Sequence, residues 1–413
     1  MFWQDKRVLI TGINGFLGRN LAEGLTRQGA QIYGFGRSTS KQGDRDHSDN
    51  STQFFLGNID VEESVRNGIS SSEPDIIFHL AAQSSVADSF QDPSKTCLTN
   101  CLGTSNLLEA VCRLKDDPVI VFAGSSDEYG LVFSTKDQYN QYVQEHGEPD
   151  YPPSNIPEIP ISENNPLRPL SPYAVSKVYG DLLMKNYHQT HGVKTVVCRS
   201  FNVEGAGRGD QYVTSVIAKQ VAGLQSGHIN KVIIGNINPI RDFSHVQDIV
   251  SGYQILAERG RTGNAYNLGS MRGVSIATYL LTCLEIAGHQ IDKIETQHGD
   301  ITLSMPLSEV SSSIFGTPLP MSNLDKSIIE GNISFSQSNR GIIVYSRDTQ
   351  IEIHFDPNKF RPVDIPILIA DARKVSKIGY QPVCSLRNII QDQLTYYRQA
   401  PPHAPLSTTD TSP

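Results

Sequence analysis

A tyrosine and a lysine, Tyr173 and Lys177, lie four residues apart in the segment Ser171-Pro172-Tyr173-Ala174-Val175-Ser176-Lys177. In a helix this spacing puts both side chains on one face. A phenol with a pKa of about 10 is a poor acid or base at neutral pH, whereas a neighbouring ammonium favours the phenolate and lowers that pKa. The pair is therefore a candidate proton shuttle. Taken alone, Tyr and Lys at this spacing are usually an exposed pair without a function.

A serine and a carboxylate stand upstream, in Gly124-Ser125-Ser126-Asp127-Glu128-Tyr129-Gly130. This segment follows the apolar run Val119 to Ala123, which predicts a strand. Ligands bind at the carboxyl ends of strands in open parallel sheets, so Ser125 could hydrogen-bond a substrate hydroxyl or carbonyl. Glu128 lies one residue beyond Asp127 and would point to the other side of the strand if the segment were extended.

A glycine-rich turn near the N-terminus predicts a dinucleotide site. The strand Arg7 to Thr11 runs directly into Gly12-Ile13-Asn14-Gly15-Phe16-Leu17-Gly18 and a helical pattern. Glycines at these positions permit the tight turn, the approach of a pyrophosphate to the backbone and close packing of helix on strand. The helix N-terminus offers free N–H groups to the phosphates. The alternative is a structural glycine turn, but strand, turn and helix follow one another in the expected order.

The second strand, Gln31 to Phe35, bears on the choice of dinucleotide. NAD enzymes normally carry an acid at the end of this strand, whereas here Gly36 is followed by Arg37 and Ser38. A guanidinium suits a 2′-phosphate, so we predict NADP, with NAD possible and a solvent-facing Arg37 as the alternative. Further cofactor contacts are predicted at Asn58 and Ile59 near the adenine and at Leu80, Ala81, Ala82 and Gln83 along the cofactor.

Alternating apolar runs and helical patterns predict the fold class: α/β, with a Rossmann-type doubly wound parallel sheet and a smaller C-terminal α/β substrate domain. Residues 1–200, with a contribution from about 236–260, should form the cofactor domain, and residues 201–235 and 261–400 the second domain. Leu131 to Pro160 looks like an inserted loop, and Asp300 to Phe355 an insertion with strands at Ile333 to Ser336 and Ile351 to Phe355. The remaining predictions are strands at Asp75 to Leu80 and Thr195 to Arg199, helices at Asn100 to Cys112 and Tyr173 to Tyr187, a polar loop at Ser38 to Thr52 and a disordered tail at 401–413.

Composition and charge exclude several classes of protein. A formal charge of -8 argues against a nucleic-acid binder. The sequence contains no apolar run of about 18 residues, so we predict no membrane span. No signal-peptide pattern precedes the first strand, so we expect a cytoplasmic protein. Cys97 and Cys101 lack a second pair or a nearby His, so we predict no metal site and expect buried, reduced thiols.

Six motifs occur in the order found in extended short-chain dehydrogenases/reductases that act on nucleotide sugars: TGINGFLG, HLAAQSSV, GSSDEYG, SPYAVSK, RSFNVEGAG and RDFSHVQD. The chain resembles that family over nearly its whole length outside the two insertions. The resemblance implies that Ser125, Tyr173 and Lys177 are the catalytic trio, and that the second domain binds a nucleoside-diphosphate sugar. It also implies a homodimer or homotetramer.

Within the family, the resemblance is strongest to the branch of GDP-4-keto-6-deoxy-mannose reductases and GDP-mannose 4,6-dehydratases, through ISENNPLRPLSPYAVSK, IIGNINPIRDFSHVQDIV and KFRPVDIPILIADARKV. It implies a GDP-linked substrate, with Asn202, Arg241 and Arg361 near the diphosphate and Asn236 close to the nucleotide. Ser84 and Ser126 complete the implied substrate contacts. For Arg241 the alternative is a structural pair with Asp242 or Asp248.

The two activities of the branch differ at two positions of GSSDEYG. The dehydratases carry Thr where this chain has Ser125, and Glu, which removes the C5 proton, where it has Asp127. The reductases resemble the present sequence more closely. We therefore predict an NADP-dependent reductase, with Asp127 as a further catalytic candidate. The alternatives are a 4,6-dehydratase, a nucleotide-sugar epimerase and a non-catalytic scaffold, against which the intact Ser/Tyr/Lys set argues.

Overall fold

A computed structural model describes residues 2–38, 52–310, 321–347, 349–360 and 365–399. Arg361, the tail at 401–413 and most of the predicted polar loop at Ser38 to Thr52 lie outside these residues.

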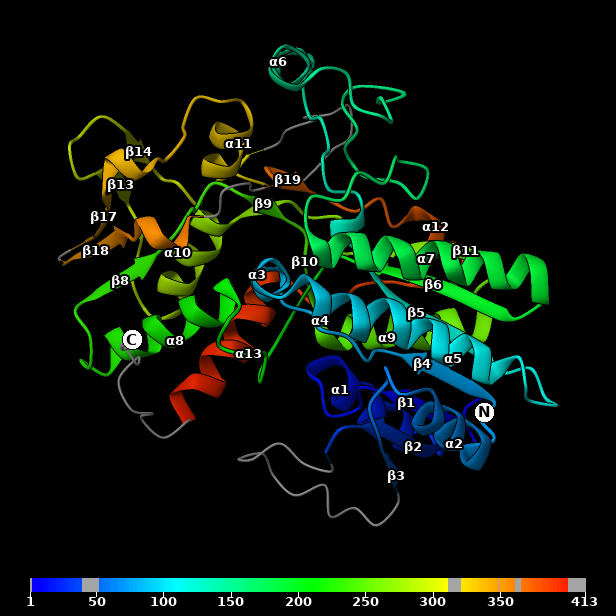
Figure 1. Ribbon diagram of the computed structural model, residues 1–413. Coiled ribbons are helices and arrows are strands. Elements are labelled where there is room, and N and C mark those ends of the chain that lie inside the picture. Colours follow the sequence, from blue (N-terminus) through cyan, green and yellow to red (C-terminus); the bar gives the residue numbers. More distant parts are fainter. Residues whose placement is uncertain (1, 39–51, 311–320, 348, 361–364, 400–413) are drawn as a thin grey trace, which may run out of the picture.

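The larger part of the molecule is a seven-stranded parallel sheet, as predicted (Figure 1). Its strand order is β11-β6-β5-β4-β1-β2-β3, and every neighbouring pair runs parallel. Parallel strands need crossover connections, which the helices on its two faces supply. The strands are β1 Arg7–Thr11, β2 Gln31–Gly36, β3 Gln53–Leu56, β4 Ile76–His79, β5 Val119–Ser125, β6 Lys194–Ser200 and β11 Asn264–Leu268.

Helices cover both faces of this sheet and bury a separate core on each side. On one face lie α1 (Phe16–Thr26) and α9 (Val246–Arg259). On the other lie α2 (Glu62–Ser72), α5 (Gly103–Val111) and α7 (Pro172–His191). The predicted helix Asn100 to Cys112 is longer and less regular than expected: α3 (Val86–Gln91), α4 (Pro93–Cys97) and the π-helix Leu98–Leu102 precede α5.

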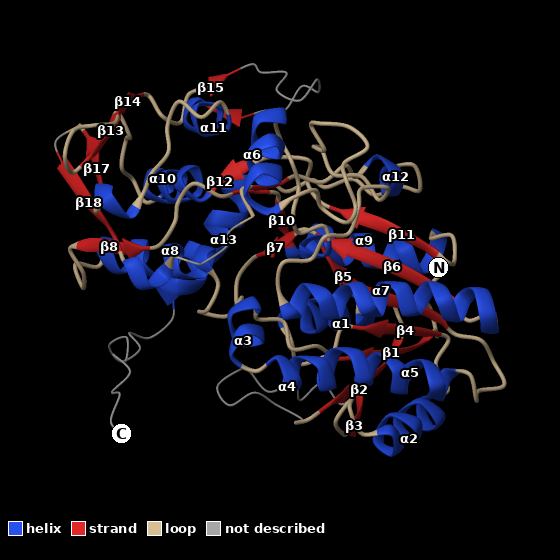
Figure 2. Cartoon of the chain, turned by 45° about the horizontal axis from the view of Figure 1, so that its top comes forward, coloured by secondary structure: helices blue, strands red, loops and turns tan. Residues whose placement is uncertain are grey.

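A second sheet of five strands lies beside the first, in the order β14-β13-β17-β18-β8 (Figure 2). It packs on α8 (Val213–Gln225), α10 (Ile276–Ile286) and α13 (Leu386–Gln399), which share one apolar core with it. The strands are β8 Lys231–Ile234, β13 Lys293–Thr296, β14 Thr302–Ser304, β17 Gly341–Ser346 and β18 Thr349–Phe355. Shorter elements are β7 Asn202–Glu204, β9 Ile240–Arg241, β10 Phe243–His245, β12 Val274–Ser275, β15 Glu309–Val310, β16 Met321–Ser322, α11 Asn323–Ile329, β19 Ile367–Leu368 and α12 Arg373–Ser376.

The insertion at Asp300 to Phe355 contributes β17 and β18, which pair antiparallel. β18 also pairs in parallel with β8, a strand that lies outside the insertion. The predicted strand at Ile351 to Phe355 is confirmed. The strand predicted at Ile333 to Ser336 is wrong, because that segment is a loop ahead of the 3₁₀ turn Gln337–Asn339. Ile333 and Phe335 are nevertheless buried, so their alternation reflects packing of a loop against the core.

Leu131 to Pro160 is not a plain loop. It holds α6 (Lys136–His146), where the Thr135 side chain caps the N-terminus by accepting a hydrogen bond from the Gln138 N–H. No residue of α6 is buried, and Figure 1 shows the helix standing out at the top of the molecule. A polar helix with no apolar face gives no strong periodicity, which is why the sequence did not indicate it.

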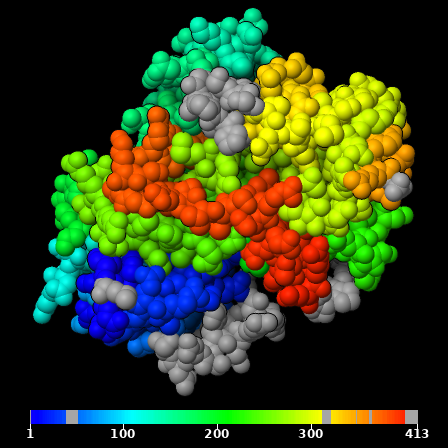
Figure 3. All heavy atoms as spheres, turned by 180° about the vertical axis from the view of Figure 1, so that it is seen from behind, coloured from blue at the N-terminus to red at the C-terminus, as the bar shows by residue number. Residues whose placement is uncertain are grey.

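The C-terminal segment joins the two parts. β11 pairs with β6 at the edge of the large sheet, although residue 264 lies beyond the contribution predicted to end near 260. Lys374 of α12 then donates to the Ala265 carbonyl at 2.7 Å. Figure 3 shows α12 and the C-terminal helix α13, in orange and red, lying across the back of the molecule above the blue N-terminal part.

Three predictions on composition can be compared with the described residues. Within them no helix is long and apolar enough to cross a membrane, and no three His, Cys, Asp or Glu side chains gather as metal ligands. The expectation of buried thiols is wrong for two cysteines, because Cys97 and Cys112 are exposed.

Candidate active site

A cavity of about 2710 Å³ extends along the carboxyl ends of the large sheet and reaches the second sheet. It contains nearly all of the residues predicted to bind cofactor or substrate. Those that line it are Gly12, Gly15, Phe16, Leu17, Gly18, Arg37, Ser38, Asn58, Ile59, Leu80, Ala81, Ala82, Ser84, Ser125, Ser126, Asp127, Tyr173, Lys177, Asn202, Asn236 and Arg241.

The glycine turn between β1 and α1 forms a cradle that side chains would fill. Gly12 has a φ of +73°, and a Cβ built on it would lie 2.8 Å from the Ala81 backbone nitrogen. A Cβ on Gly18 would lie 2.4 Å from the Gly12 carbonyl oxygen. Gly15 caps α1 without any side-chain hydrogen bond, which leaves the first backbone N–H groups of the helix without a capping side chain. These features fit a dinucleotide pyrophosphate.

Replacing Gly12 by alanine should destabilise the protein and weaken nicotinamide dinucleotide binding. The left-handed φ alone costs a residue with a Cβ about 1–2 kcal/mol, and the contact with Ala81 adds to it. Gly147→Ala is the matched control, because Gly147 has a φ of +81° and no atom lies within 4 Å of the place that its Cβ would take. Thermal unfolding and a fluorescence titration with NADPH should show a larger effect at Gly12 in both measurements. Equal effects of the two substitutions would contradict the assignment of the glycine turn as the pyrophosphate site.

Arg37 and Ser38 follow β2 and line the cavity beside the glycine turn. The Asn14 side-chain amide donates to the Ser38 carbonyl and so ties the end of β2 to that turn. No acidic side chain comes from the end of this strand, since Gly36, Arg37 and Ser38 occupy it. The arrangement puts a cation at the position where NAD enzymes have a ribose-binding acid.

The segment after β4 contributes only part of what was predicted. Leu80, Ala81 and Ala82 line the cavity, but Gln83 does not. The Gln83 side chain donates to the Ser85 carbonyl, and its backbone is held by the Asn100 side chain through N–H and C=O contacts of 2.8 and 3.0 Å. The structure therefore positions Gln83 outside the cleft, although its motif suggested a cofactor contact.

Ser125, Tyr173 and Lys177 come together at the carboxyl end of β5, as the sequence predicted. Ser171 caps α7 and Pro172 occupies its first turn, so the helix starts directly before Tyr173. Tyr173 and Lys177 lie on the helix face that packs on β5, and the Tyr173 hydroxyl lies close enough to Ser125 for the serine to lower its pKa. Lys177 donates to the Ala123 carbonyl at 2.7 Å, and its Nζ lies 5.9 Å from the centre of the Tyr173 ring.

The electrostatics of the pair differ from expectation. Burial, followed by the negative charge of Asp127, raises the pKa of the Tyr173 hydroxyl, and the hydrogen bond with Ser125 offsets only part of this. Burial also lowers the pKa of Lys177 to about 8, against the charges of Glu128 and Cys101. The expectation that Lys177 lowers the Tyr173 pKa is therefore wrong for this structure. Tyr173 keeps its proton at neutral pH and is ready to act as an acid.

Asp127 and Ser126 lie in a short 3₁₀ helix, Ser126–Glu128, directly after β5. Ser125 caps this turn, since its hydroxyl accepts the Asp127 N–H at 3.2 Å. Both Ser126 and Asp127 line the cavity, whereas Glu128 folds back beneath it and is fully buried. Because the segment turns instead of continuing the strand, the sequence argument on the direction of Glu128 does not apply.

The predicted substrate residues come from four separate segments. Asn202 follows β6 in β7, Asn236 and Arg241 flank the loop before β10, and Ser84 follows β4. The Ser84 hydroxyl lies 3.3 Å from the Tyr212 hydroxyl across the cleft. Asp242 and Asp248, the two acids considered as structural partners of Arg241, accept backbone N–H groups of Ser270, Met271, Ala370, Val383 and Cys384.

Arg208 was not singled out from the sequence, although it lines the same cavity as Asn202 and Arg241. Its guanidinium lies 2.9 Å from Glu204 and 3.9 Å from the centre of the Tyr212 ring. The only signal in the sequence was an arginine close behind the motif that contains Asn202, and that motif ends at Gly207.

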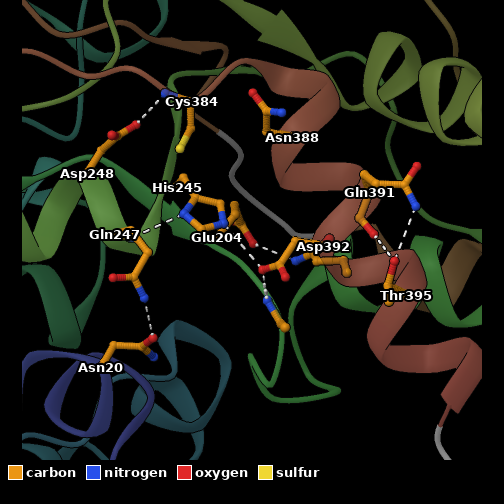
Figure 4. Close-up of polar contacts among 12 residues, drawn as sticks. Asn20, Glu204, His245, Gln247, Asp248, Cys384, Asn388, Gln391, Asp392 and Thr395 are labelled. Atoms are coloured by element: carbon orange, nitrogen blue, oxygen red, sulfur yellow. Dashed lines mark hydrogen bonds and ion pairs between the residues drawn. The ribbon is translucent and has the colours of Figure 1, made fainter. Parts of the chain in front are cut away.

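The C-terminal helix fixes the loop that carries Arg208 (Figure 4). Asp392 of α13 accepts the Ala206 N–H at 2.7 Å and lies 3.3 Å from His245 Nε2. These contacts hold the pKa of Asp392 below its ordinary value. His245 caps α9, so the Asp392 carboxylate joins the loop at Ala206, the start of α9 and the C-terminal helix. Neither insertion, 131–160 or 300–355, contributes a described residue to the cavity lining.

Comparisons with known proteins agree with this geometry. Residues 8–269 match the family described as NAD dependent epimerase/dehydratase family. The chain is 27% identical to GDP-mannose 4,6-dehydratase of Vibrio cholerae serotype O1, over 97% of this chain and 95% of the relative. It is 31% identical to GDP-6-deoxy-D-mannose reductase of Pseudomonas aeruginosa, over 54% of this chain and 66% of the relative. Among solved structures, RMD from Pseudomonas aeruginosa complexed with NADPH has a TM-score of 0.66 at 22% identity, covering 96% of this chain and all of that one.

Proposed function

The chain belongs to the NAD dependent epimerase/dehydratase family, and we propose that it is an NADP-dependent reductase acting at C4 of a GDP-linked 4-keto-6-deoxy-hexose. The observation that carries the proposal is the buried Tyr173 hydroxyl, which lines the cavity together with Ser125 and Asp127. Burial and the Asp127 carboxylate both raise the pKa of the tyrosine, so its resting form carries the proton that a ketone needs on reduction.

The residues of the chain divide this chemistry between them. When bound, NADPH supplies a hydride for the carbonyl carbon. The Tyr173 hydroxyl donates its proton to the developing O4 alkoxide, and the Ser125 hydroxyl holds that oxygen by a hydrogen bond. Lys177 lies beside the ring as a cation and stabilises the phenolate that remains until solvent returns the proton.

The length of Asp127 favours reduction over elimination. A dehydratase needs a carboxylate within hydrogen-bond reach of the C5 proton. Aspartate is one methylene shorter than the glutamate of the dehydratases, which withdraws the carboxylate by about 1.5 Å. A misplacement of this order can cost about 10²-fold in rate. A ketone reductase removes no C5 proton and tolerates the shorter side chain.

A 4,6-dehydratase is the second candidate. Its support is the Vibrio cholerae relative of that name, which matches along almost the entire chain, whereas the reductase relative matches over about half of it. For this activity Asp127 would be the base that removes the C5 proton.

Asp127→Asn separates the two candidates. A reductase should keep turnover within about tenfold, because the amide removes a charge near Tyr173 but no reacting group. A dehydratase should lose at least about 10²-fold, the usual contribution of a positioned base. The measurement is product formation from GDP-mannose and from its 4-keto-6-deoxy derivative, each followed by mass spectrometry. If the reductive turnover fell by 10²-fold or more, Asp127 would be a reacting group and its proposed role would be rejected.

Arg37→Ala tests the choice of cofactor. If the guanidinium meets a 2′-phosphate, the starting protein should bind NADPH more tightly than NADH. The substitution should reduce that preference by about 1.5–3 kcal/mol, as expected for a hydrogen bond to a charged group. Arg27→Ala is the control, because Arg27 is an exposed arginine paired with Glu23 on α1. Titration calorimetry with both cofactors gives the preference, and equal affinities in the starting protein would contradict the assignment.

A further inference from the structure

A pair of buried carboxyl groups lies directly behind the catalytic serine, and the mechanism above does not use it. Glu128 and Asp181 are both fully buried, and neither lines the cavity. Glu128 comes from the turn after β5, and Asp181 lies one helical turn after Lys177 on α7. Buried acids are costly unless they are paired, so this arrangement calls for an explanation.

Glu128 and Ser125 fix each other's positions. Glu128 Oε1 accepts the Ser125 backbone N–H at 2.7 Å, while the Ser125 hydroxyl accepts the Asp127 N–H. The two contacts form a capping box around the three-residue turn. Gly124 makes room for this arrangement, because a Cβ there would lie 2.6 Å from Glu128 Oε1. The orientation of the serine hydroxyl therefore depends on Glu128.

The charges around Glu128 come from α7 and β6. Glu128 Oε2 lies 3.4 Å from Arg199 Nε, but Asp181 holds the same nitrogen more closely, at 2.8 Å. Lys185 neutralises the other oxygen of Asp181 at 2.6 Å. Arg199 also donates to the Tyr129 hydroxyl, and Glu128 Oε2 accepts no hydrogen bond of its own. Asp181 therefore takes most of the guanidinium charge, and Glu128 is left incompletely paired.

Glu128 and Lys177 hold backbone groups two residues apart on β5, because Glu128 accepts the Ser125 N–H and Lys177 donates to the Ala123 carbonyl, each at 2.7 Å. This places the charge of Glu128 where it acts on Lys177. Burial and the charge of Asp181 raise the pKa of Glu128 to about 8, against Arg199 and the Ser125 N–H. Burial lowers the pKa of Lys177 to about 8, and the negative charge of Glu128 is the largest effect that opposes it. The charge on either group therefore favours the charge on the other.

We propose that Glu128 is a positioning residue, which orients Ser125 through its backbone N–H and, once ionised, supplies a negative charge that favours the ammonium form of Lys177. It acts through these two residues and does not contact substrate or cofactor. The proposal rests on the reductase function proposed above only for its kinetic readout.

Glu128→Gln and Glu128→Ala separate the two roles. Glutamine keeps an acceptor for the Ser125 N–H and imitates the protonated acid, whereas alanine removes both acceptor and charge. We expect Glu128→Gln to move the basic limb of kcat/KM to lower pH by about one unit, a modest effect for a neighbouring charge. Glu128→Ala should show the same shift of the basic limb to lower pH. In addition, kcat should fall by about tenfold across the pH range, the equivalent of one lost hydrogen bond.

Glu158→Gln is the matched control. Glu158 is also a buried glutamate, paired with Arg168, and it accepts a backbone N–H, that of Phe133, at 2.9 Å. It does not line the cavity. This control should lose stability without moving the basic limb of the profile.

A direct titration makes the test independent of the substrate. In protein labelled with ¹³C-lysine, the Lys177 signal is assigned by its loss in Lys177→Arg and followed against pH by NMR. Its midpoint should fall by about one unit in Glu128→Gln and stay in place in Glu158→Gln. An unchanged midpoint in Glu128→Gln would overturn the proposal. Absence of turnover in the starting protein, with the midpoint shift present, would instead contradict the proposed function and leave this inference supported.

Discussion

Tyr173→Phe is expected to reduce turnover by about 10²–10⁴-fold while nicotinamide dinucleotide binding stays nearly unchanged. The phenylalanine fills the same buried space on α7 and lacks only the hydroxyl, close to Ser125, that gives up the proton. The measurement is the steady-state rate together with a calorimetric titration of NADPH.

Tyr179→Phe is the control for this prediction. Tyr179 lies on the same helix, is 40% exposed, and its hydroxyl contacts Ser105 at 2.8 Å, outside the cavity lining. Its loss should leave turnover close to that of the starting protein. Near-normal turnover in Tyr173→Phe would end the assignment of Tyr173 as the proton donor.

Arg199→Met should strongly destabilise the protein. Arg199 lies between the buried carboxyl groups of Asp181 and Glu128, with its side chain 2% exposed. Removing one partner of a buried pair leaves an uncompensated charge and costs about 3–5 kcal/mol. Denaturant unfolding should show a loss of this size.

Arg7→Met provides the contrast. Arg7 also pairs with two acids, Glu73 and Asp75, but these side chains are 71% and 34% exposed. Solvent screens such pairs, and the expected loss is below about 1 kcal/mol. Similar losses for Arg7→Met and Arg199→Met would mean that the cluster behind Ser125 is not held by its buried charges.

The parts of the fold that the sequence predicted are the elements whose structure is determined by residues close together in the chain. β1, the glycine turn and α1 follow from an apolar run, three glycines and a leucine period, and all lie as expected. The Tyr173 and Lys177 pair follows equally from helical spacing, and the helix α7 carries both residues as expected. These features depend on neighbours within a few residues, which a single sequence contains.

The features that the sequence missed depend on distant contacts. The turn at Ser126–Glu128 buries Glu128 because Arg199 and Asp181, from β6 and α7, lie behind it. The direction of the Tyr173 pKa depends on burial, which spacing alone does not reveal. Arg208 enters the cavity because Asp392, 184 residues further on, holds the preceding loop.

The position of a hydrogen isotope tests the central claim most directly. We would incubate the protein with GDP-4-keto-6-deoxy-mannose and NADPH carrying two deuterium atoms at nicotinamide C4, and analyse the sugar by mass spectrometry and NMR. A C4 reductase should give one deuterium at C4 of the hexose for each NADPH oxidised. A parallel incubation uses GDP-mannose deuterated at C4. Rapid water elimination from it, with deuterium recovered at C6 and no net change in nicotinamide absorbance, would contradict the reductase and favour the dehydratase.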